Sequence, residues 1–505
     1  HDPEKWELFK AYNKGDVTAE MEIDQRLSAI EIPNSIQKEW ETDLLMNARG
    51  VAVDMDMVYG ALEIGAKEKE RLTREAMNIS GLDNPNSVAQ LSSWLESETN
   101  EEVYDLRKDT VAKMLQREDN SPEVQRMLEI RRELGKTSTK KYDAIQNAVC
   151  ADGRVRGLLQ FYGANRTGRW AGRLVQVQNL PRTYTEPLEL ARQLVKERKT
   201  DALRLIYGSI PDTLSQLIRT AFIAPPGHTL IDADFSAIEA RVISWLAGEA
   251  WRLEVFRTHG KIYEASASQM FGVPIEKIKK GNPEYALRQK GKVAELALGY
   301  QGSSSALIAM GALDMGIPEE DLPDIVSRWR EANKRIRDLW YKVDSAAVWV
   351  TAHGGSVGVN GILISKEFNP AQNTEYLTVS LPSGRKLYYV QPQISENRWG
   401  NPSISYMGMD QTTKKWKRVE TYGGKLVENI VQAIARDCLA LSIERLKEAG
   451  YNVVFHIHDE VVIECEEERA SLDEAVKIMS EPIPWAPDLP LGACLLYTSD
   501  AADEE

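Results

Sequence analysis

Two acidic segments that lie far apart in the chain most constrain what this sequence can fold into. They cover residues 230–241 and residues 456–464, and each places an acidic side chain, Asp234 or Asp459, at the end of an apolar run with the length of a strand. A carboxylate beside apolar neighbours is costly to bury unless it is paired or holds a metal ion. We therefore expect Asp234 and Asp459 to meet at one site and to bind a divalent cation such as Mg²⁺, which takes one or two carboxylates plus substrate phosphates.

The first segment also has an ordinary interpretation. Strand alternation puts Asp232 on the same face as Asp234, in a strand at about residues 229–234. Asp234 or Ser236 could instead cap the helix expected at about 236–247. Glu239 would then be an ordinary acid of the first helical turn, where the helix dipole favours negative charge.

The second segment reads as a hairpin. Asn452–His458 and Val461–Cys465 are the expected strands, with Asp459 and Glu460 at the turn. An acidic hairpin tip is common on protein surfaces. Here the flanking strands are strongly apolar, which favours a buried hairpin whose acidic tip needs a partner.

A third segment, residues 288–302, is basic and is expected to form a helix. Arg288 and Lys292 are one turn apart, and Leu296 and Tyr300 continue the same stripe. Two cations at this spacing repel each other, so an anion such as a triphosphate would stabilise them. A solvated basic helix face is the alternative.

The rest of the 505-residue chain indicates one α+β body with helical lobes. Helices are expected at Met57–Met77 and Ser121–Val149, with Ser87 capping another. Residues 160–185 are rich in Gly and Arg and are expected to be loops. Residues 350–425 have β-type alternation, and a helix is expected at 426–449.

Net charge and cysteine content narrow the classes of protein only weakly. The net charge of −14 argues against a nucleic-acid binder, but basic residues gather near the chemical segments, where their distribution matters more than the sum. The four cysteines are widely spaced, which predicts no disulfide framework and fits a reducing cytoplasm. No apolar run is long enough to cross a bilayer, so no membrane partner is expected.

The three segments together resemble motifs A, B and C of family A DNA polymerases, the bacterial DNA polymerase I type, in a phage-like member. Motif A is matched by Asp234-Phe-Ser-Ala-Ile-Glu-Ala-Arg241 and motif C by His458-Asp459-Glu460. Motif B, Arg-x3-Lys-x3-Phe-x3-Tyr, is matched by Arg288, Lys292, Leu296 and Tyr300. The resemblance extends over about residues 50–493. Leu296 departs from it, because the family has an aromatic residue there that packs against the incoming sugar.

The resemblance implies an α+β right-hand polymerase fold, with an antiparallel palm sheet, fingers and a thumb, that extends a primer in DNA replication or repair. The implied division is residues 1–48 as the end of an RNase H-like 3′–5′ exonuclease domain and linker, 49–160 as thumb, 161–245 as the first part of the palm, 246–350 as fingers, 351–425 as a β-rich insert, 426–493 as the second part of the palm and 494–505 as a non-native tail. The insert is either a structural flap or a contact for DNA or a partner. The exonuclease end rests on the Tyr-x3-Asp spacing of Tyr12 and Asp16.

The resemblance also assigns roles to residues. Asp234, Asp459 and the carbonyl of Phe235 are implied to hold two Mg²⁺ ions, with Glu460 nearby and Lys292 taking part in the chemistry. The implied deoxynucleoside triphosphate contacts are Arg288, Lys292, Leu296, Tyr300, Tyr263 and Glu239, the last blocking a ribose 2′-hydroxyl. The expected contacts with primer–template DNA are Arg169, Gln432, His458, Lys140 and Lys141.

Two other functions compete with this interpretation. A single-subunit RNA polymerase shares the palm architecture, although Glu239 argues against it. A catalytically impaired DNA-binding fragment is the second, because both ends of the chain look incomplete. The expected protein is a cytoplasmic monomer of a bacterial or phage-infected cell, and the sequence does not identify a processivity factor.

Overall fold

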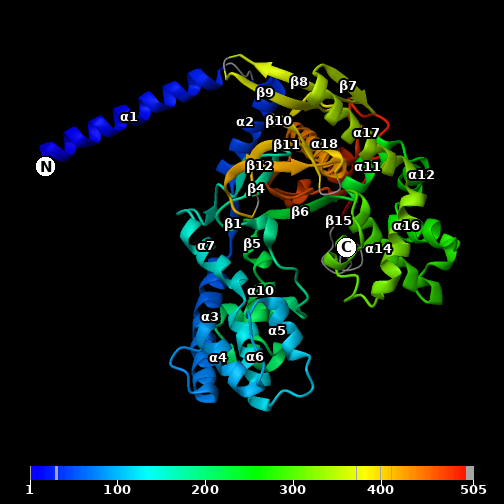
Figure 1. Cartoon of the computed structure of the whole chain (residues 1–505). Coiled ribbons are helices and arrows are strands. Elements are labelled where there is room, and N and C mark those ends of the chain that lie inside the picture. Colours follow the sequence, from blue (N-terminus) through cyan, green and yellow to red (C-terminus); the bar gives the residue numbers. More distant parts are fainter. Residues whose placement is uncertain (1, 29–31, 371, 398–399, 411, 496–505) are drawn as a thin grey trace.

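The computed structural model describes residues 2–28, 32–370, 372–397, 400–410 and 412–495. It combines antiparallel sheets with helices in a central body, a lower helical lobe and a second helical lobe beside it (Figure 1). This is the mixed α+β architecture expected from the sequence. No helix within the described ranges is long and apolar enough to span a membrane.

The palm is built on a four-stranded antiparallel sheet in the order β13-β14-β6-β15. Its strands are β6 (His228–Phe235), β13 (Asn452–Ile457), β14 (Glu460–Glu466) and β15 (Ala493–Leu495). Helices α18 (Gly423–Glu448) and α19 (Leu472–Ser480) pack on it, and α11 (Ile238–Ala247) packs on α18. The strands predicted at 229–234 and 452–465 and the helix predicted at 426–449 are thus present. Residues 496–505 of the predicted tail lie outside the described residues.

The lower lobe is helical, as the sequence predicts for the thumb. It contains α3 (Met55–Ser80), α4 (Val88–Thr99), α5 (Lys108–Leu115), α6 (Pro122–Leu134) and α7 (Lys140–Ala148). Ser87 caps α4 by accepting from the Gln90 amide, as expected. The single helix predicted over 121–149 is wrong, because α6 ends at Leu134 and a short 3₁₀ turn separates it from α7.

This lobe also takes in residues that the sequence assigned to the palm. Helices α8 (Leu188–Lys196) and α10 (Ile210–Gln216) pack against α3. Helix α9 (Thr200–Tyr207) packs against α8 and α10. The buried hydroxyl of Tyr142 donates to the Leu214 carbonyl at 2.7 Å. Residues 188–216, which the sequence assigned to the first part of the palm, therefore lie in the lower lobe.

The second lobe holds the helices expected of the fingers. They are α12 (Ala250–Thr258), α13 (Ile262–Phe271), α14 (Ala286–Leu298), α15 (Ser304–Ala309), α16 (Leu322–Ala332) and α17 (Lys334–His353). The charge of Arg252, which is 1% exposed, is neutralised inside this lobe by Glu295 of α14, with Arg252 Nη1 and Glu295 Oε1 2.8 Å apart. That buried pair ties α12 to α14.

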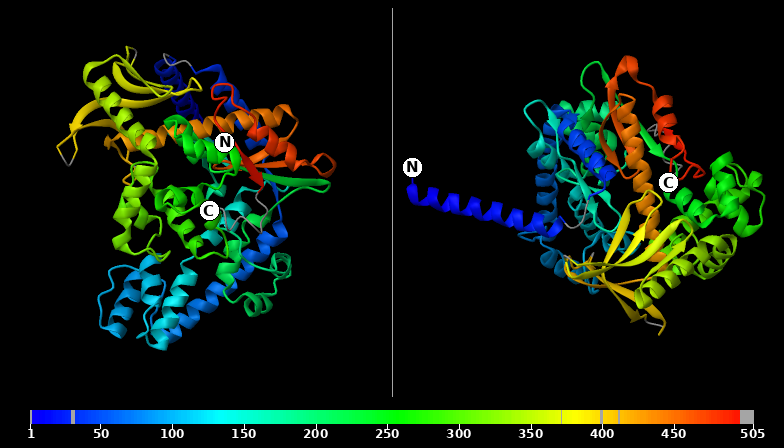
Figure 2. Two further views of the ribbon diagram at one scale, coloured as in Figure 1. Left: turned by 90° about the vertical axis from the view of Figure 1, so that its right-hand side faces the viewer. Right: turned by 90° about the horizontal axis from the view of Figure 1, so that it is seen from above.

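The insert is a six-stranded antiparallel sheet in the order β12-β11-β10-β9-β8-β7. Its strands are β7 (Ser356–Val359), β8 (Ile362–Asn369), β9 (Thr374–Ser380), β10 (Lys386–Glu396), β11 (Pro402–Met409) and β12 (Trp416–Thr421). One face packs on α17, with Ile364, Leu377 and Tyr389 buried. Figure 2 shows this sheet on the outside of the palm and fingers.

The N-terminal region divides differently from the prediction. Helix α1 (Pro3–Leu27) projects from the body and buries none of its residues (Figures 1 and 2). Helix α2 (Asn34–Arg49) instead packs on the palm, where Trp170 Nε1 donates to Asp43 Oδ1 at 2.9 Å. Helix α2, which the sequence assigned to the exonuclease end and linker, is therefore packed on the body.

Two small sheets complete the fold. Strands β1 (Val51–Val53), β2 (Arg154–Val155) and β5 (Phe222–Ile223) form a sheet of three strands. Strands β3 (Leu159–Ala164) and β4 (Arg169–Gly172) form a hairpin where the sequence predicted only loops. Glycines made the segment look like a loop in the sequence, although the hairpin needs them. Gly163 allows a close contact with Ala171, and Gly168 adopts the positive φ of 77° that the turn requires.

Candidate active site

The register of the palm sheet brings the two acidic segments together. Strand β14 pairs antiparallel with β6 so that Glu460 lies opposite Asp234. Asp459 is in the turn immediately before Glu460, and its carbonyl accepts from the Phe235 amide at 3.3 Å. The carboxylates of Asp234 and Asp459 thus come from adjacent strand ends, as the sequence predicts.

Two details of the sequence interpretation are corrected here. The hairpin turn consists of His458 and Asp459, with His458 in the left-handed region at a φ of 51°, while Glu460 is already the buried first residue of β14. The alternative role of Asp234 or Ser236 as a helix cap is wrong. The N-cap of α11 is Ala237, and no side chain caps that helix.

Burial raises the pKa values of this acidic group. Loss of solvent raises the pKa of Asp459 to about 6, and the nearby charges of Glu239 and Glu460 add to the rise. Burial also raises the pKa of Glu460, and Asp232 raises it further as a charged hydrogen-bond acceptor. Glu460 therefore holds a proton more firmly than Asp232, whose own pKa burial also raises.

This donor set fits a hard divalent cation. Oxygen ligands alone are present, from Asp234, Asp459 and the Phe235 carbonyl, which suits Mg²⁺. Within the described ranges no three His, Cys, Asp or Glu side chains form a ready ligand set. Mg²⁺ commonly completes its shell with water and substrate phosphates, so few protein ligands are needed.

The basic helix of the fingers presents its two cations to one aromatic ring. The Arg288 guanidinium lies 5.5 Å and the Lys292 ammonium 5.9 Å from the centroid of Tyr263, which belongs to α13. Gly291 allows α13 and α14 to approach closely, because a Cβ there would lie 2.2 Å from the Tyr263 carbonyl oxygen. Arg288 also donates to Glu264 at 2.9 Å. Tyr263, Arg288 and Lys292 are therefore brought together as predicted.

The end of the basic helix differs from the prediction. Helix α14 stops at Leu298, so Tyr300 lies beyond it and not on its stripe. Leu296 is 47% exposed on the last turn. Gly299 and Gly302 follow this end of the helix. Glycine is less favourable in a helix than alanine by about 1 kcal/mol, which favours termination here.

Glu239 connects the acidic strand to the fingers. Its Oε2 accepts from the Tyr300 hydroxyl at 2.6 Å, and its Oε1 accepts from Arg169 Nη2 of β4. Burial and the Glu239 charge raise the pKa of Tyr300, so its hydroxyl remains a donor. This bridge places motif A, the fingers and the β3–β4 hairpin around one centre.

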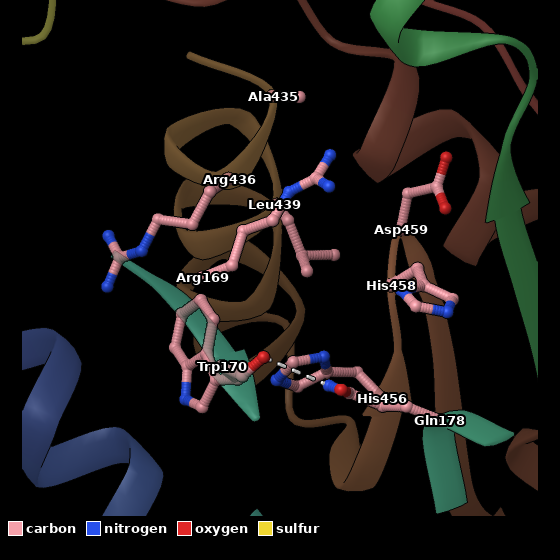
Figure 3. A pocket seen from close by; sticks show the side chains of 9 residues that line it. All are labelled: Arg169, Trp170, Gln178, Ala435, Arg436, Leu439, His456, His458 and Asp459. Carbon is pink, nitrogen blue, oxygen red and sulfur yellow. Dashed lines mark hydrogen bonds between the residues drawn. The ribbon is translucent and has the colours of Figure 1, made fainter. Parts of the chain in front are cut away.

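A pocket lies beside the two-residue turn (Figure 3). The residues that line it are Arg169, Trp170, Gln178, Ala435, Arg436, Leu439, His456, His458 and Asp459. The Asp459 carboxylate points to one end, while Trp170 and His456 close the other, their rings 4.8 Å apart edge to face (Figure 3). Burial lowers the pKa of His456 to about 3, and the Arg436 charge adds to this, so His456 is neutral at pH 7.

The family model of DNA polymerase family A matches residues 62–493. This chain belongs to that family. It is 52% identical over 495 residues to a DNA polymerase of Bacillus phage SP02, covering 98% of this chain and 74% of the phage protein. It is 24% identical to the thermostable DNA polymerase I of Thermus aquaticus, over 87% of this chain and 44% of that protein.

The fold of this family A polymerase is also similar to a solved structure. That structure is titled the POL domain of Pol1 from M. smegmatis in complex with DNA primer-template and dNTP. The TM-score is 0.60 at 22% identity, and the match covers 91% of this chain and 68% of that one. The right-hand polymerase fold expected from the sequence is thereby confirmed.

Sequence reasoning missed the residues of the polymerase that support Arg169. Arg436 of α18 is 2% exposed, donates to the Gly168 carbonyl at 3.0 Å and lies 4.4 Å over the Trp170 ring. Its neighbour Asp437 accepts from Arg385 of the insert at 2.7 Å. The available signal was the four-residue step from Gln432 to Arg436, which puts both on one helix face.

The predicted DNA contacts lie in varied surroundings. His458 is exposed at the turn and Gln432 is half-buried on α18. Lys140 is exposed at the start of α7. Lys141 donates to the carbonyls of Val175 and Gln176 at 2.7 and 2.9 Å, so its ammonium group already anchors the thumb to the palm.

Proposed function

We propose that this chain is a template-directed DNA polymerase that adds deoxynucleotides to a primer 3′ end by two-metal nucleotidyl transfer. The observation that carries the proposal is the bridge from Arg169 through Glu239 to Tyr300. It joins the acidic strand end to the base of the cationic helix, so that both groups serve one reaction centre. A cation-binding pair of carboxylates beside a triphosphate-binding helix is what phosphoryl transfer requires.

Asp234, Asp459 and the Phe235 carbonyl are the proposed ligands of two Mg²⁺ ions. When bound, these ions supply activation of the primer 3′-hydroxyl and charge stabilisation on the leaving pyrophosphate. Glu460 is not among the proposed ligands, because it is a buried residue of β14. Its raised pKa suits a helper that is hydrogen-bonded to Asp232, and not a ligand.

The fingers residues hold the nucleotide in this proposal. Arg288 and Lys292 bind the triphosphate, with the Tyr263 ring centroid 5.5 and 5.9 Å from their charged groups. Lys292 is 9% exposed, so its interaction with charge that develops in the transition state is screened little by water. Glu239, held by Tyr300, occupies the place of a ribose 2′-hydroxyl, and Leu296 packs against the sugar.

Primer–template DNA is the proposed macromolecular partner. Arg169, Gln432 and His458 read minor-groove shape near the primer end, because base pairing supplies the sequence information. Lys140, together with any remaining donor of Lys141, contacts backbone phosphates. The enzyme is proposed to act as a monomer in the cytoplasm of a bacterial cell, where this DNA and the triphosphates are found.

A primer-extension assay tests the proposal. Wild type and Asp234→Ala are compared on one primer–template with matched deoxynucleotides and Mg²⁺, and Asp473→Ala serves as the control. Asp473 is an exposed acid of α19. Extension by wild type and the control but not by Asp234→Ala is expected. Failure of wild type to extend would support the DNA-binding fragment, and equal use of ribonucleotides would support an RNA polymerase.

The exonuclease end remains a separate proposal. Tyr12 and Asp16 lie on α1, which buries no side chain. We expect no degradation of a labelled primer, because the other acidic motifs of such an exonuclease are not in this sequence. Shortened primer products from the purified chain would contradict that expectation.

A further inference from the structure

The hairpin of β11 and β12 is the edge of the insert sheet and carries an exposed basic turn. Lys414, Lys415 and Trp416 are all exposed, Trp416 to 56%. They lie on a chain whose net charge is −14, so the local sign is opposite to the global one. An exposed sheet edge with cations and an aromatic residue is the kind of surface that tracks a nucleic-acid backbone.

Asp410 organises this turn. Its Oδ1 accepts from the amides of Thr412 and Thr413 at 3.0 and 2.7 Å. Its Oδ2 pairs with Lys417 at 2.9 Å, which neutralises that lysine. Among the described residues no ion pair engages Lys414 or Lys415, and both side chains are exposed. The hydrogen bonds of Asp410 fix the backbone of the turn that carries them.

The hairpin is attached to the part of the palm that carries the proposed DNA contacts. The carbonyl of Met409, at the end of β11, accepts from Arg166 Nη2 at 3.2 Å. Arg166 is in the β3–β4 turn, three residues before Arg169. Figure 1 shows β12 close to β4, consistent with this contact. DNA held at Arg169 would therefore pass close to the basic turn.

We propose that Lys414 and Lys415 bind backbone phosphates of the primer–template duplex behind the primer end. This inference rests on the proposed function, because it requires the primer end to lie at Arg169. Duplex DNA carries one negative charge for about every 1.7 Å of its axis, so two fixed lysines meet phosphates without reading sequence. The insert then acts as an extension of the palm that lengthens the grip on the duplex.

Salt-dependent binding tests the inference. Lys414→Gln/Lys415→Gln is compared with wild type and with Lys10→Gln/Lys14→Gln, which removes two exposed lysines from the projecting α1. Dissociation constants are measured across a salt series on two primer–templates, one with a long duplex and one with a duplex too short to reach the insert. On the long duplex the slope of log K against log salt should become shallower by about 2 for the hairpin variant. The short duplex and the α1 control should show the wild-type slope.

The outcomes separate this inference from the proposed function. Single-nucleotide insertion on the short duplex should be the same for wild type and the hairpin variant. If the hairpin variant keeps the wild-type slope on the long duplex, the inference is overturned and the basic turn is left to a protein partner or to solvent. If wild type itself inserts no nucleotide, the proposed polymerase function fails, whereas the slope still reports on the hairpin.

Discussion

Glu68 of the thumb and Asp459 of the palm are two desolvated carboxylates whose pKa values shift in opposite directions. Glu68 of the thumb is 2% exposed and receives hydrogen bonds from Arg71 and Arg204 at 2.8 and 2.7 Å. Burial acts to raise the pKa of Glu68, but these bonds outweigh it and lower the pKa. In the palm, burial raises the pKa of Asp459 to about 6, and Arg169, which opposes this, is already paired with Glu239.

We interpret the difference as that between a structural acid, Glu68, and a proposed metal ligand, Asp459. The thumb supplies its own countercharge, so its buried acid is stable in the chain alone. Around Asp459, burial and the charges of Glu239 and Glu460 outweigh the charge of Arg169, so a bound cation would stabilise its carboxylate. The raised pKa of Asp459 therefore supports the proposed site together with its position beside Asp234, and not by itself.

The largest test of this contrast is Asp459→Ala. Removing a proposed metal ligand should slow extension by at least about 10²- to 10³-fold, the scale of losing a group that stabilises transition-state charge. The unfolding midpoint should stay or rise, because a desolvated acid with like-charged neighbours is removed. Single-turnover extension and urea unfolding measure the two effects. A variant that extends at the wild-type rate would sink the metal assignment.

The converse test is Glu68→Ala in the thumb. It leaves Arg71 and Arg204 without their shared acid, which should lower the free energy of unfolding by about 1–3 kcal/mol. Both arginine side chains are about one-third exposed, so this loss is smaller than for a fully buried pair. Urea unfolding measures this, with the exposed Glu70→Ala as control. Extension well below the unfolding transition should match wild type. A large loss of extension without loss of stability would remove the distinction between the two acids.

How far the sequence predicts this contrast depends on the residue. Asp234 and Asp459 are identifiable because each follows an apolar strand, and motif order joins them to Arg288 and Lys292. Glu68 reads as one more acid of an amphipathic helix, because packing rather than local spacing brings its second partner, Arg204, to it. Only Arg71 is a helical neighbour, and Arg204 comes from α9.

Other features depend on long-range contacts or on backbone geometry. Arg436 supports the Gly168 loop across a sequence separation of 268 residues, which no local pattern encodes. The β3–β4 hairpin was hidden by its glycines. The end of α14 was misplaced because the four-residue stripe runs on to Tyr300 although the helix does not.

A third, smaller effect is the pH dependence of metal binding. Because the folded pKa of Asp459 is about 6 and the usual value is about 3.9, the folded chain binds this proton more tightly than the unfolded chain does. Protonation therefore stabilises the fold as pH falls from above 6 towards 4, and opposes metal binding in the same range. The Mg²⁺ concentration for half-maximal extension should rise by up to about tenfold per pH unit below 6.

The same window supplies the control for the pH experiment. Unfolding of Asp459→Ala should lose the part of the pH dependence between 4 and 6 that this group contributes. Wild type and variant are unfolded in urea at each pH, alongside the Mg²⁺ titration of wild type. A half-saturating Mg²⁺ concentration that is flat across this range would show that Asp459 is ionised in the folded chain as it is in water.

The smallest predicted effect concerns Glu239. Unlike Asp459, this acid accepts hydrogen bonds from two partners, Arg169 and Tyr300. Tyr300→Phe removes one donor and leaves Arg169 to hold the carboxylate. A net hydrogen bond of about 1 kcal/mol predicts that the preference for deoxynucleotides over ribonucleotides falls by about fivefold. Tyr389→Phe is the matched control, since Tyr389 bonds Asn429 and not Glu239. Competitive insertion of the two triphosphates measures the ratio. An unchanged ratio would mean that Arg169 alone positions Glu239, and that the fingers contribute nothing to sugar selection through this contact.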